Sequence, residues 1–247
     1  MKIKSLVPNG LTMGNLTCGV LAINCTIQGD WKMVAFLMIL ATIFDFFDGF
    51  AARLLKVCGP LGAQLDSLAD MVTFGVLPGF IVWQWLLEIN TTPFEWLPYV
   101  GLVIPIFSAY RLAKFNIDDR QSDSFIGVPT PANALLIVCL PLIGLGTWND
   151  MGFGAHLIAD SLQAIFLNPY AICVIAIVFS FLLIAEIPLF SLKFKSFGWA
   201  ANKTRWSFLI SALFLILLFA FMAIPIIILL YLLISIINNT LHKQHEV

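Results

Sequence analysis

Charged residues are scarce in this sequence. Only 11% of its 247 residues are Asp, Glu, Lys or Arg, whereas 60% are hydrophobic. A soluble globular domain has about a quarter charged residues and about half apolar residues. The deficit excludes an ordinary soluble domain and predicts an integral membrane protein. The formal net charge of −1 says little about partners, because the charges are segregated along the chain; we expect no nucleic-acid partner.

Motifs built from cysteine or histidine are also missing. The five cysteines are scattered and form no CxxC spacing or Cys/His cluster, so we expect neither a zinc site nor a redox site. We expect them to be small buried side chains. The first 15 residues contain two lysines but no short apolar core that ends in a cleavage site, which predicts a mature N-terminus rather than a signal peptide.

Long apolar runs recur along the whole chain. A helix needs about 20 apolar residues to cross the hydrocarbon, and the runs predict an all-α polytopic transmembrane bundle of eight helices. The segment from about 150 to 167 is less apolar, which predicts a loop with a short interfacial helix. Six predicted spans cover about 11–27, 32–56, 61–87, 97–115, 130–145 and 170–190.

The last apolar run, 206–237, is too long for one upright helix. It would reach about 45 Å, against about 30 Å of hydrocarbon. We expect a hairpin of two helices with Pro225 in the first turn of the second, rather than one kinked helix. The chain would then divide into a six-helix core, 1–192, and a part at 193–247 with a basic loop, the hairpin and a short cytoplasmic tail.

The cations indicate the orientation. With an even number of spans, Lys32 lies on one side and twelve cations lie on the other, which by the positive-inside rule is the cytoplasm. The twelve are Lys2, Lys4, Arg53, Lys56, Arg111, Lys114, Arg120, Lys193, Lys195, Lys203, Arg205 and Lys243.

Four aspartates interrupt the second and third predicted spans. Asp45 and Asp48 are three residues apart, and Asp66 and Asp70 are four apart, so each pair shares one face of its helix. A tight turn at 59–60 makes the two helices antiparallel neighbours. We therefore expect the four carboxylates to converge near the cytoplasmic end of the pair.

Such a cluster needs positive charge. An ionised aspartate at the centre of a span costs about 2.5 to 3.5 kcal/mol, and Arg53 supplies one charge only. Divalent cations with oxygen ligands would supply the rest, and carboxylate-rich sites suit magnesium or manganese.

Spacing alone leaves three interpretations open: metal-dependent phosphoryl chemistry, an ion or proton pathway in a transporter, and a structural role in helix pairing. Gly49 and Ala52 on the aspartate face, and Gly62 on the partner helix, let a bulky group approach the backbone. A nucleotide diphosphate needs that room, whereas a bare cation does not.

The spacing Asp-x2-Asp-Gly-x2-Ala-Arg-x8-Gly-x3-Asp-x3-Asp is complete from Asp45 to Asp70. It resembles the signature of the CDP-alcohol phosphatidyltransferase family. The resemblance implies that an alcohol hydroxyl attacks the β-phosphate of a CDP-linked lipid and that CMP leaves. It implies two divalent cations, Mg²⁺ or Mn²⁺, held by Asp45, Asp48, Asp66 and Asp70, with Asp70 also taking the proton from the hydroxyl.

Two further segments resemble the phosphatidylserine synthase branch of that family. The first is 8–15, Pro-Asn-Gly-Leu-Thr-Met-Gly-Asn, which implies nucleotide contacts for Asn9 and Thr12; the alternative is an N-cap and turn. With Gly49, Ala52, Arg53 and Gly62 they make up the expected CDP-lipid site.

The second segment runs from Arg111-Leu-Ala-Lys-Phe-Asn116 to the Gly-x-Pro-x-Pro turn at 127–131. Arg111 would hold the carboxylate of serine and Asn116 would assist. The alternative is that Arg111 and Lys114 extend to lipid headgroups. Glu186 is expected to face water or a lysine rather than to act in catalysis.

The resemblance thus implies transfer of a phosphatidyl group from CDP-diacylglycerol to L-serine, in a homodimer surrounded by membrane lipids, at the cytoplasmic face of the cell membrane. An acceptor with a phosphate, glycerol 3-phosphate or an inositol phosphate, would need a denser cluster of cations. A transporter is the alternative of a different class. Transporters often contain internal repeats, and the sequence has no second copy of the aspartate motif.

Overall fold

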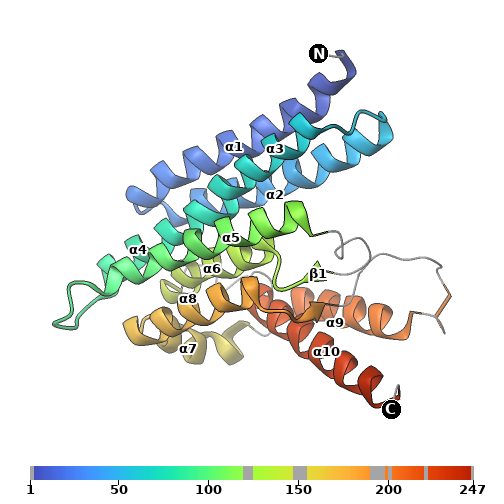
Figure 1. The fold of residues 1–247 in the computed structure, drawn as a ribbon. Coiled ribbons are helices and arrows are strands. Elements are labelled where there is room, and N and C mark those ends of the chain that lie inside the picture. The colour runs from blue at the N-terminus through green and yellow to red at the C-terminus, as the bar shows by residue number, and fades with distance from the viewer. Residues whose placement is uncertain are drawn as a thin grey trace.

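The chain folds into a bundle of helices (Figure 1). The computed structural model describes residues 3–118, 125–146, 155–189, 198–199, 202–219 and 222–245. Its elements, in chain order, are η1 (Ile3–Ser5), α1 (Leu6–Ile27), α2 (Trp31–Leu54), α3 (Pro60–Asp70), η2 (Met71–Val76), α4 (Leu77–Ile89), η3 (Leu97–Leu102), α5 (Val103–Ile117), β1 (Phe125–Ile126), α6 (Thr130–Gly144), α7 (Ala155–Phe166), α8 (Pro169–Ile184), β2 (Pro188–Leu189), α9 (Lys203–Phe219) and α10 (Ala223–His245).

Several helices are long and apolar enough to cross a membrane, which confirms the predicted all-α membrane fold. Four qualify within the described residues: α1, α2, the continuous run Pro60–Ile89 and the run Leu97–Ile117. Part of α7 and all of α8 make a fifth span if they are counted together, with a bend of 80° between them. α6 and the apolar part of α10 are shorter, so the predicted number of eight spans stays a prediction.

The long C-terminal run is divided into two helices, as predicted. α9 ends at Phe219 and α10 begins at Ala223, so Pro225 lies in the first turn of α10. There its missing N–H costs no helical hydrogen bond. The two helices contact each other through the rings of Phe208 and Tyr231, whose centroids are 5.4 Å apart.

Two features differ from the sequence prediction. α1 begins at Leu6 rather than near residue 11, because Pro8 is accommodated in the first turn of the helix. The two-residue strands β1 and β2 pair antiparallel; strands this short leave no alternating pattern that a sequence could show.

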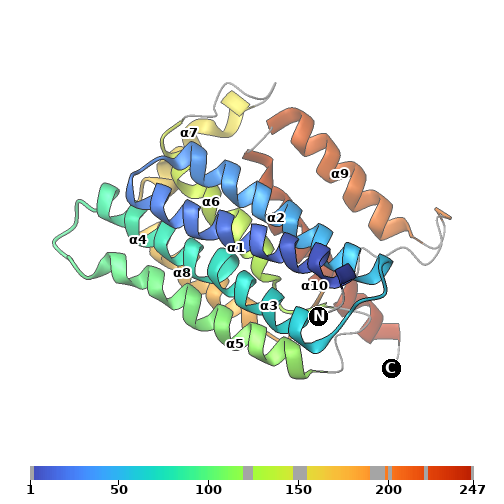
Figure 2. The same ribbon diagram turned by 90° about the horizontal axis from the view of Figure 1, so that it is seen from above.

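The core lies around α6 and α4. Almost every residue of α6 is buried, and the largest fully buried side chain, Trp85 of α4, donates a hydrogen bond from Nε1 to the carbonyl of Phe166 at 2.9 Å. Figure 2 shows α6 in the interior, with α1, α2 and α4 on one side of it. Many large apolar side chains on the outer helices are exposed, among them Phe36 and Ile106, as expected for a surface that faces lipid.

One end of the bundle gathers the cations of the described helix ends. The N-terminus, the connection between α2 and α3, the end of α5 and the C-terminus lie at the same end of the molecule (Figure 1). Arg53, Lys114 and Lys203 belong to these helix ends, whereas Lys32 begins α2 at the other end. The predicted cations Lys2, Arg120, Lys193 and Lys195, the side chain of Lys243 and most of the basic loop lie outside the described residues.

Candidate metal and nucleotide site

The connection between α2 and α3 brings the four aspartates together. α2 ends at Leu54, Lys56 adopts a left-handed backbone conformation (φ 53°), and α3 begins at Pro60 behind an extended Gly59. Proline at the first helical position pre-sets the helical backbone. This short connection turns the chain back, and α2 and α3 both pack against α1, which lies between them in the view of Figure 2.

Three of the carboxylates form a compact group. One oxygen each of Asp45, Asp48 and Asp66 lies within 4.8 Å of the others. Asp48 is only 5% exposed, and Asp66 Oδ1 is buried without a hydrogen-bond partner among the described residues. Three converging carboxylates and an unsatisfied buried oxygen fit a hard divalent cation. The described residues therefore suit a metal ion chemically.

Asp70 lies beside this group rather than in it. Its carboxylate interacts electrostatically with those of Asp45 and Asp66. It also accepts a hydrogen bond at Oδ1 from Asn15 Nδ2 of α1, 3.1 Å away. Asp70 thus adjoins the group of three carboxylates and interacts directly with Asp45.

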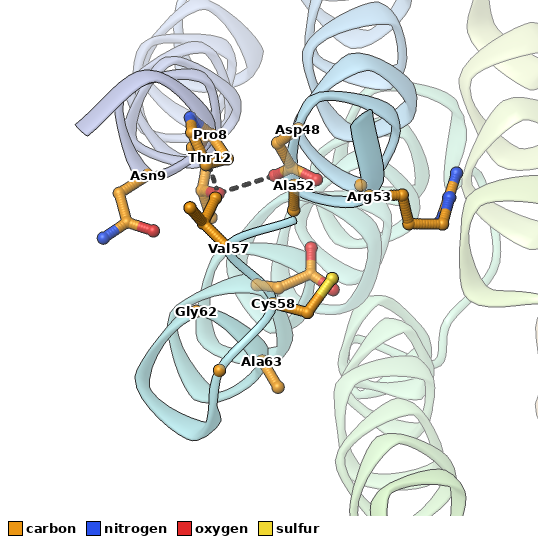
Figure 3. A pocket seen from close by; sticks show the side chains of 13 residues that line it. Pro8, Asn9, Thr12, Asp48, Ala52, Arg53, Val57, Cys58, Gly62 and Ala63 are labelled. Carbon is orange, nitrogen blue, oxygen red and sulfur yellow. Dashed lines mark hydrogen bonds between the residues drawn. The ribbon is translucent and has the colours of Figure 1, made fainter. Parts of the chain in front are cut away.

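A cavity of about 300 Å³ opens next to the aspartates. Figure 3 shows it between the start of α1, the end of α2 and the start of α3. Its volume is at the lower end of those typical of small-molecule sites. All six residues predicted to contact the CDP-lipid line it together with Asp48 and Asp66; the six are Asn9, Thr12, Gly49, Ala52, Arg53 and Gly62.

Thr12 links the cavity wall to the aspartates. Its hydroxyl donates to Asp48 Oδ2 at 2.6 Å, the dashed line between the two side chains in Figure 3, and also lies 3.1 Å from the carbonyl oxygen of Pro8. Asn9 and Thr12 both belong to α1, so neither is a capping residue. A hydroxyl that donates to Asp48 fixes the direction of that carboxylate. The sequence prediction did not assign this orienting role to Thr12.

The small residues have different uses. A Cβ on Gly49 would lie 3.4 Å from Arg53 Nη1, so Gly49 leaves room for the guanidinium. In Figure 3, Arg53 extends away from Thr12. A Cβ on Gly62 would lie 3.7 Å from Asn9 Oδ1, so Gly62 keeps the cavity open where α3 faces α1. Cys58 also lines the cavity and is exposed, which corrects the expectation that all the cysteines are buried.

Arg111 is a buried residue of α5 that does not line this cavity. It is 7% exposed, its guanidinium is 6.0 Å from the ring of Phe115, and Nε has no partner among the described residues. It attracts Asp70 electrostatically, without a direct ion pair between the two described side chains.

The structure does not bring Asn116 to Arg111. Asn116 is exposed at the end of α5 and exchanges hydrogen bonds with Ser67 of α3, at 2.9 Å and 3.2 Å. These hydrogen bonds join the end of α5 to α3 at Ser67, the residue after Asp66. Lys114 forms a salt bridge with Glu186 at 3.1 Å, which confirms that Glu186 pairs with a lysine.

Comparisons with known proteins identify the family of this chain. A family model described as CDP-alcohol phosphatidyltransferase matches residues 5–167, about two thirds of the chain. The chain belongs to the CDP-alcohol phosphatidyltransferase family. The match includes α1, α2 and α3, which carry the carboxylates and the cavity.

Relatives of this chain carry related names. A Bacillus subtilis protein named CDP-diacylglycerol–serine O-phosphatidyltransferase is 35% identical over 147 residues, 57% of this chain and 81% of that protein. A Helicobacter pylori protein of the same name is 36% identical over 140 residues, 56% of this chain and 58% of that protein. An archaetidylserine synthase from Methanothermobacter thermautotrophicus is 32% identical over 149 residues, 58% of this chain and 61% of that protein. The matched segments of the last two relatives thus make up less than two thirds of their length.

Sequence reasoning missed some polar residues of this phosphatidyltransferase. Asn15, Ser108 and Asn133 are fully buried, and each has at least one side-chain atom without a hydrogen-bond partner among the described residues. Asn15 lies three residues after Thr12, so helical spacing places both on one face of α1. That spacing could have indicated Asn15; nothing in the sequence pattern indicates the other two.

The cavity predicts the effect of a substitution at Ala52. Ala52→Leu would place three more carbon atoms in the cavity, whereas the neighbouring Ala51 does not line it. Overpacking costs about 1–3 kcal/mol, and 1.4 kcal/mol is about tenfold in affinity. We expect Ala52→Leu to weaken CMP binding about tenfold or more, measured by isothermal titration calorimetry in detergent with Mn²⁺.

Ala51→Leu is the matched control and should bind CMP as the wild type does. Equal affinity of all three proteins would show that the cavity is not the nucleotide site.

Proposed function

We propose that this chain transfers the phosphatidyl group of CDP-diacylglycerol to L-serine, giving phosphatidylserine and CMP. The observation that carries the choice of acceptor is the arrangement of the cations on α5. Arg111 lies beside Asp70 with Nε unpartnered, whereas Lys114 is already paired with Glu186. One available guanidinium suits one carboxylate better than a doubly charged phosphate. The names of the related proteins support the same acceptor.

The side chains divide the reaction among them. The cytidine and its phosphates would occupy the cavity between α1, α2 and α3, with Asn9, Thr12 and Arg53 on its wall. Serine would lie between Arg111, which holds its carboxylate, and Asp70, which receives the hydroxyl proton. The serine oxygen bonds to the β-phosphorus, the bond from that phosphorus to the bridging oxygen breaks, and CMP leaves with the electron pair.

Metal ions complete the site in this proposal. Asp45, Asp48, Asp66 and Asp70 would hold two divalent ions, Mg²⁺ or Mn²⁺. Bound ions would neutralise the pyrophosphate and the charge that develops on the leaving CMP. Thr12 keeps Asp48 directed for that purpose through its 2.6 Å hydrogen bond. Positioning and charge stabilisation carry most of phosphoryl transfer; the carboxylates would contribute to both by holding the ions in place.

The location of the site follows from the charges. The end of the bundle with the described cations of α2, α5 and α9 would face the cytoplasm, so the reaction would take place at the cytoplasmic face of the cell membrane. There a water-soluble acceptor meets a lipid-borne donor. The homodimer that the family resemblance implies is also part of this proposal.

An acceptor assay tests the proposed function. Purified protein in detergent with CDP-diacylglycerol and Mn²⁺ is given radiolabelled L-serine or radiolabelled glycerol 3-phosphate. We expect labelled lipid and equimolar CMP with serine, and neither with glycerol 3-phosphate, because Arg111 offers a site for one carboxylate. Lipid product and CMP from glycerol 3-phosphate alone would show that the serine assignment is wrong.

Arg111 should control the affinity for serine. Losing one partner of a buried charge pair costs about 2 kcal/mol or more, which is about 30-fold in binding. We expect Arg111→Ala to raise the KM for serine about 30-fold or more while the KM for CDP-diacylglycerol changes less than about threefold.

Lys114→Ala is the matched control on the same helix, and it should leave both KM values close to those of the wild type. An equal rise of both KM values in Arg111→Ala would contradict the role in carboxylate binding.

A further inference from the structure

Asn15 makes the hydrogen bond that orients Asp70. The residue is fully buried on the inner face of α1, and its Nδ2 donates to Asp70 Oδ1 at 3.1 Å. No position of the aspartate motif accounts for it, and it does not line the nucleotide cavity. Its effect on the reaction would therefore pass through Asp70.

The backbone around Asn15 is fixed by the helix segment that follows Asp70. η2 is a π-helical segment, which begins at Met71, directly after Asp70. Its Thr73 donates a hydrogen bond from Oγ1 to the carbonyl oxygen of Asn15 at 3.2 Å. Short π-helical segments interrupt α-helices frequently at functional sites. In this protein the segment places Thr73, which follows Asp70 by three residues, in contact with α1.

Gly19 allows this contact. A Cβ on Gly19 would overlap Thr73 Oγ1 and lie 3.1 Å from Thr73 Cα, so α1 and η2 touch at their backbones. α1 is therefore held against the helix of Asp70 at two levels, by Gly19 against Thr73 and by Asn15 against Asp70. This close packing fixes the position from which the Asn15 amide reaches the carboxylate.

The chemistry of the amide suits the task. Asp70 faces the negative charges of Asp45 and Asp66, so its carboxylate needs a donor to hold it in place. A neutral amide donates without adding charge, whereas a lysine or arginine would compete with divalent ions for the same oxygen. Asn15 Oδ1 remains unpartnered among the described residues. A buried unpaired carbonyl is costly, so packing alone does not explain an asparagine here.

We propose that Asn15 is a positioning residue, which holds the carboxylate of Asp70 in the orientation needed to accept the proton of the attacking hydroxyl. The inference rests on the proposed function in one respect, the role of Asp70 as the base. It does not depend on which alcohol is the acceptor.

The test removes the amide in two ways. Asn15→Leu keeps the branched outline and adds bulk, whereas Asn15→Ala leaves space, so an effect common to both comes from the amide rather than from packing. Thr26→Val is the matched control, a buried polar residue on the same face of α1 whose hydroxyl donates to Ala22 within its own helix. Steady-state CMP release is measured with whichever alcohol the wild type uses.

We expect both Asn15 variants to lower kcat about 10–100-fold, the usual effect of removing a partner that orients a site carboxylate. The KM for CDP-diacylglycerol should change less than about threefold, and Thr26→Val should behave as the wild type. A kcat within about threefold of the wild type for both Asn15 variants, or an equal loss in Thr26→Val, would overturn the inference.

A double variant separates positioning from a general structural effect. Asp70→Asn alone should retain only a residual rate, and adding Asn15→Leu to it should not lower that rate further, because the two residues act as one unit. A further loss by the same factor as in Asn15→Leu would show that Asn15 acts independently of Asp70. If the wild type uses another alcohol instead of serine, the acceptor assignment fails while these ratios still decide the role of Asn15.

Discussion

Repulsion among the carboxylates of α2 and α3 is the constraint that the rest of the site satisfies. Each ionised aspartate in a span costs about 2.5 to 3.5 kcal/mol to insert, and like charges at close range add to that cost. Oxygens of three aspartates lie within 4.8 Å of one another. A fold that tolerates this arrangement gains something from it, and binding of divalent cations explains both the cost and the residue type.

The surrounding structure holds this unfavourable cluster in one geometry. α1 supplies neutral donors to two of the carboxylates, Thr12 to Asp48 and Asn15 to Asp70. The π-helical segment and Gly19 hold α1 against the helix of Asp70. Gly49 and Gly62 leave the neighbouring nucleotide cavity open. The orientation of the aspartates therefore depends on α1 as much as on the helices that carry them.

Much of the fold and of the site could be predicted because the signals are local and strong. The apolar runs indicated the helices, and the length of 206–237 indicated two helices, which the structure contains. The spacing of Asp45, Asp48, Asp66 and Asp70 predicted one cluster, since a short turn between neighbouring helices leaves few other arrangements. The six residues assigned to the CDP-lipid all line one cavity.

Other features depend on contacts that sequence spacing does not encode. Asn116 precedes a recognisable turn motif, but its side chain donates a hydrogen bond to Ser67. The hydrogen bond from Asn15 to Asp70 joins residues 55 positions apart, and the π-helical segment between α3 and α4 leaves no pattern in hydropathy. α1 begins at Leu6, before the apolar run from which its start near residue 11 was predicted, because the first turn of a helix accepts Pro8.

The most direct test of the central claim is a titration of the detergent-solubilised protein with Mn²⁺. The electron paramagnetic resonance signal of free Mn²⁺ reports how much of the metal is bound. With CMP present, the wild type should bind two Mn²⁺ ions per chain, as the four carboxylates imply. Asp66→Asn should lose binding of at least one ion while its helical content stays unchanged. Binding in Asp66→Asn that equals the wild type, or no saturable binding to either protein, would contradict a metal site at these carboxylates.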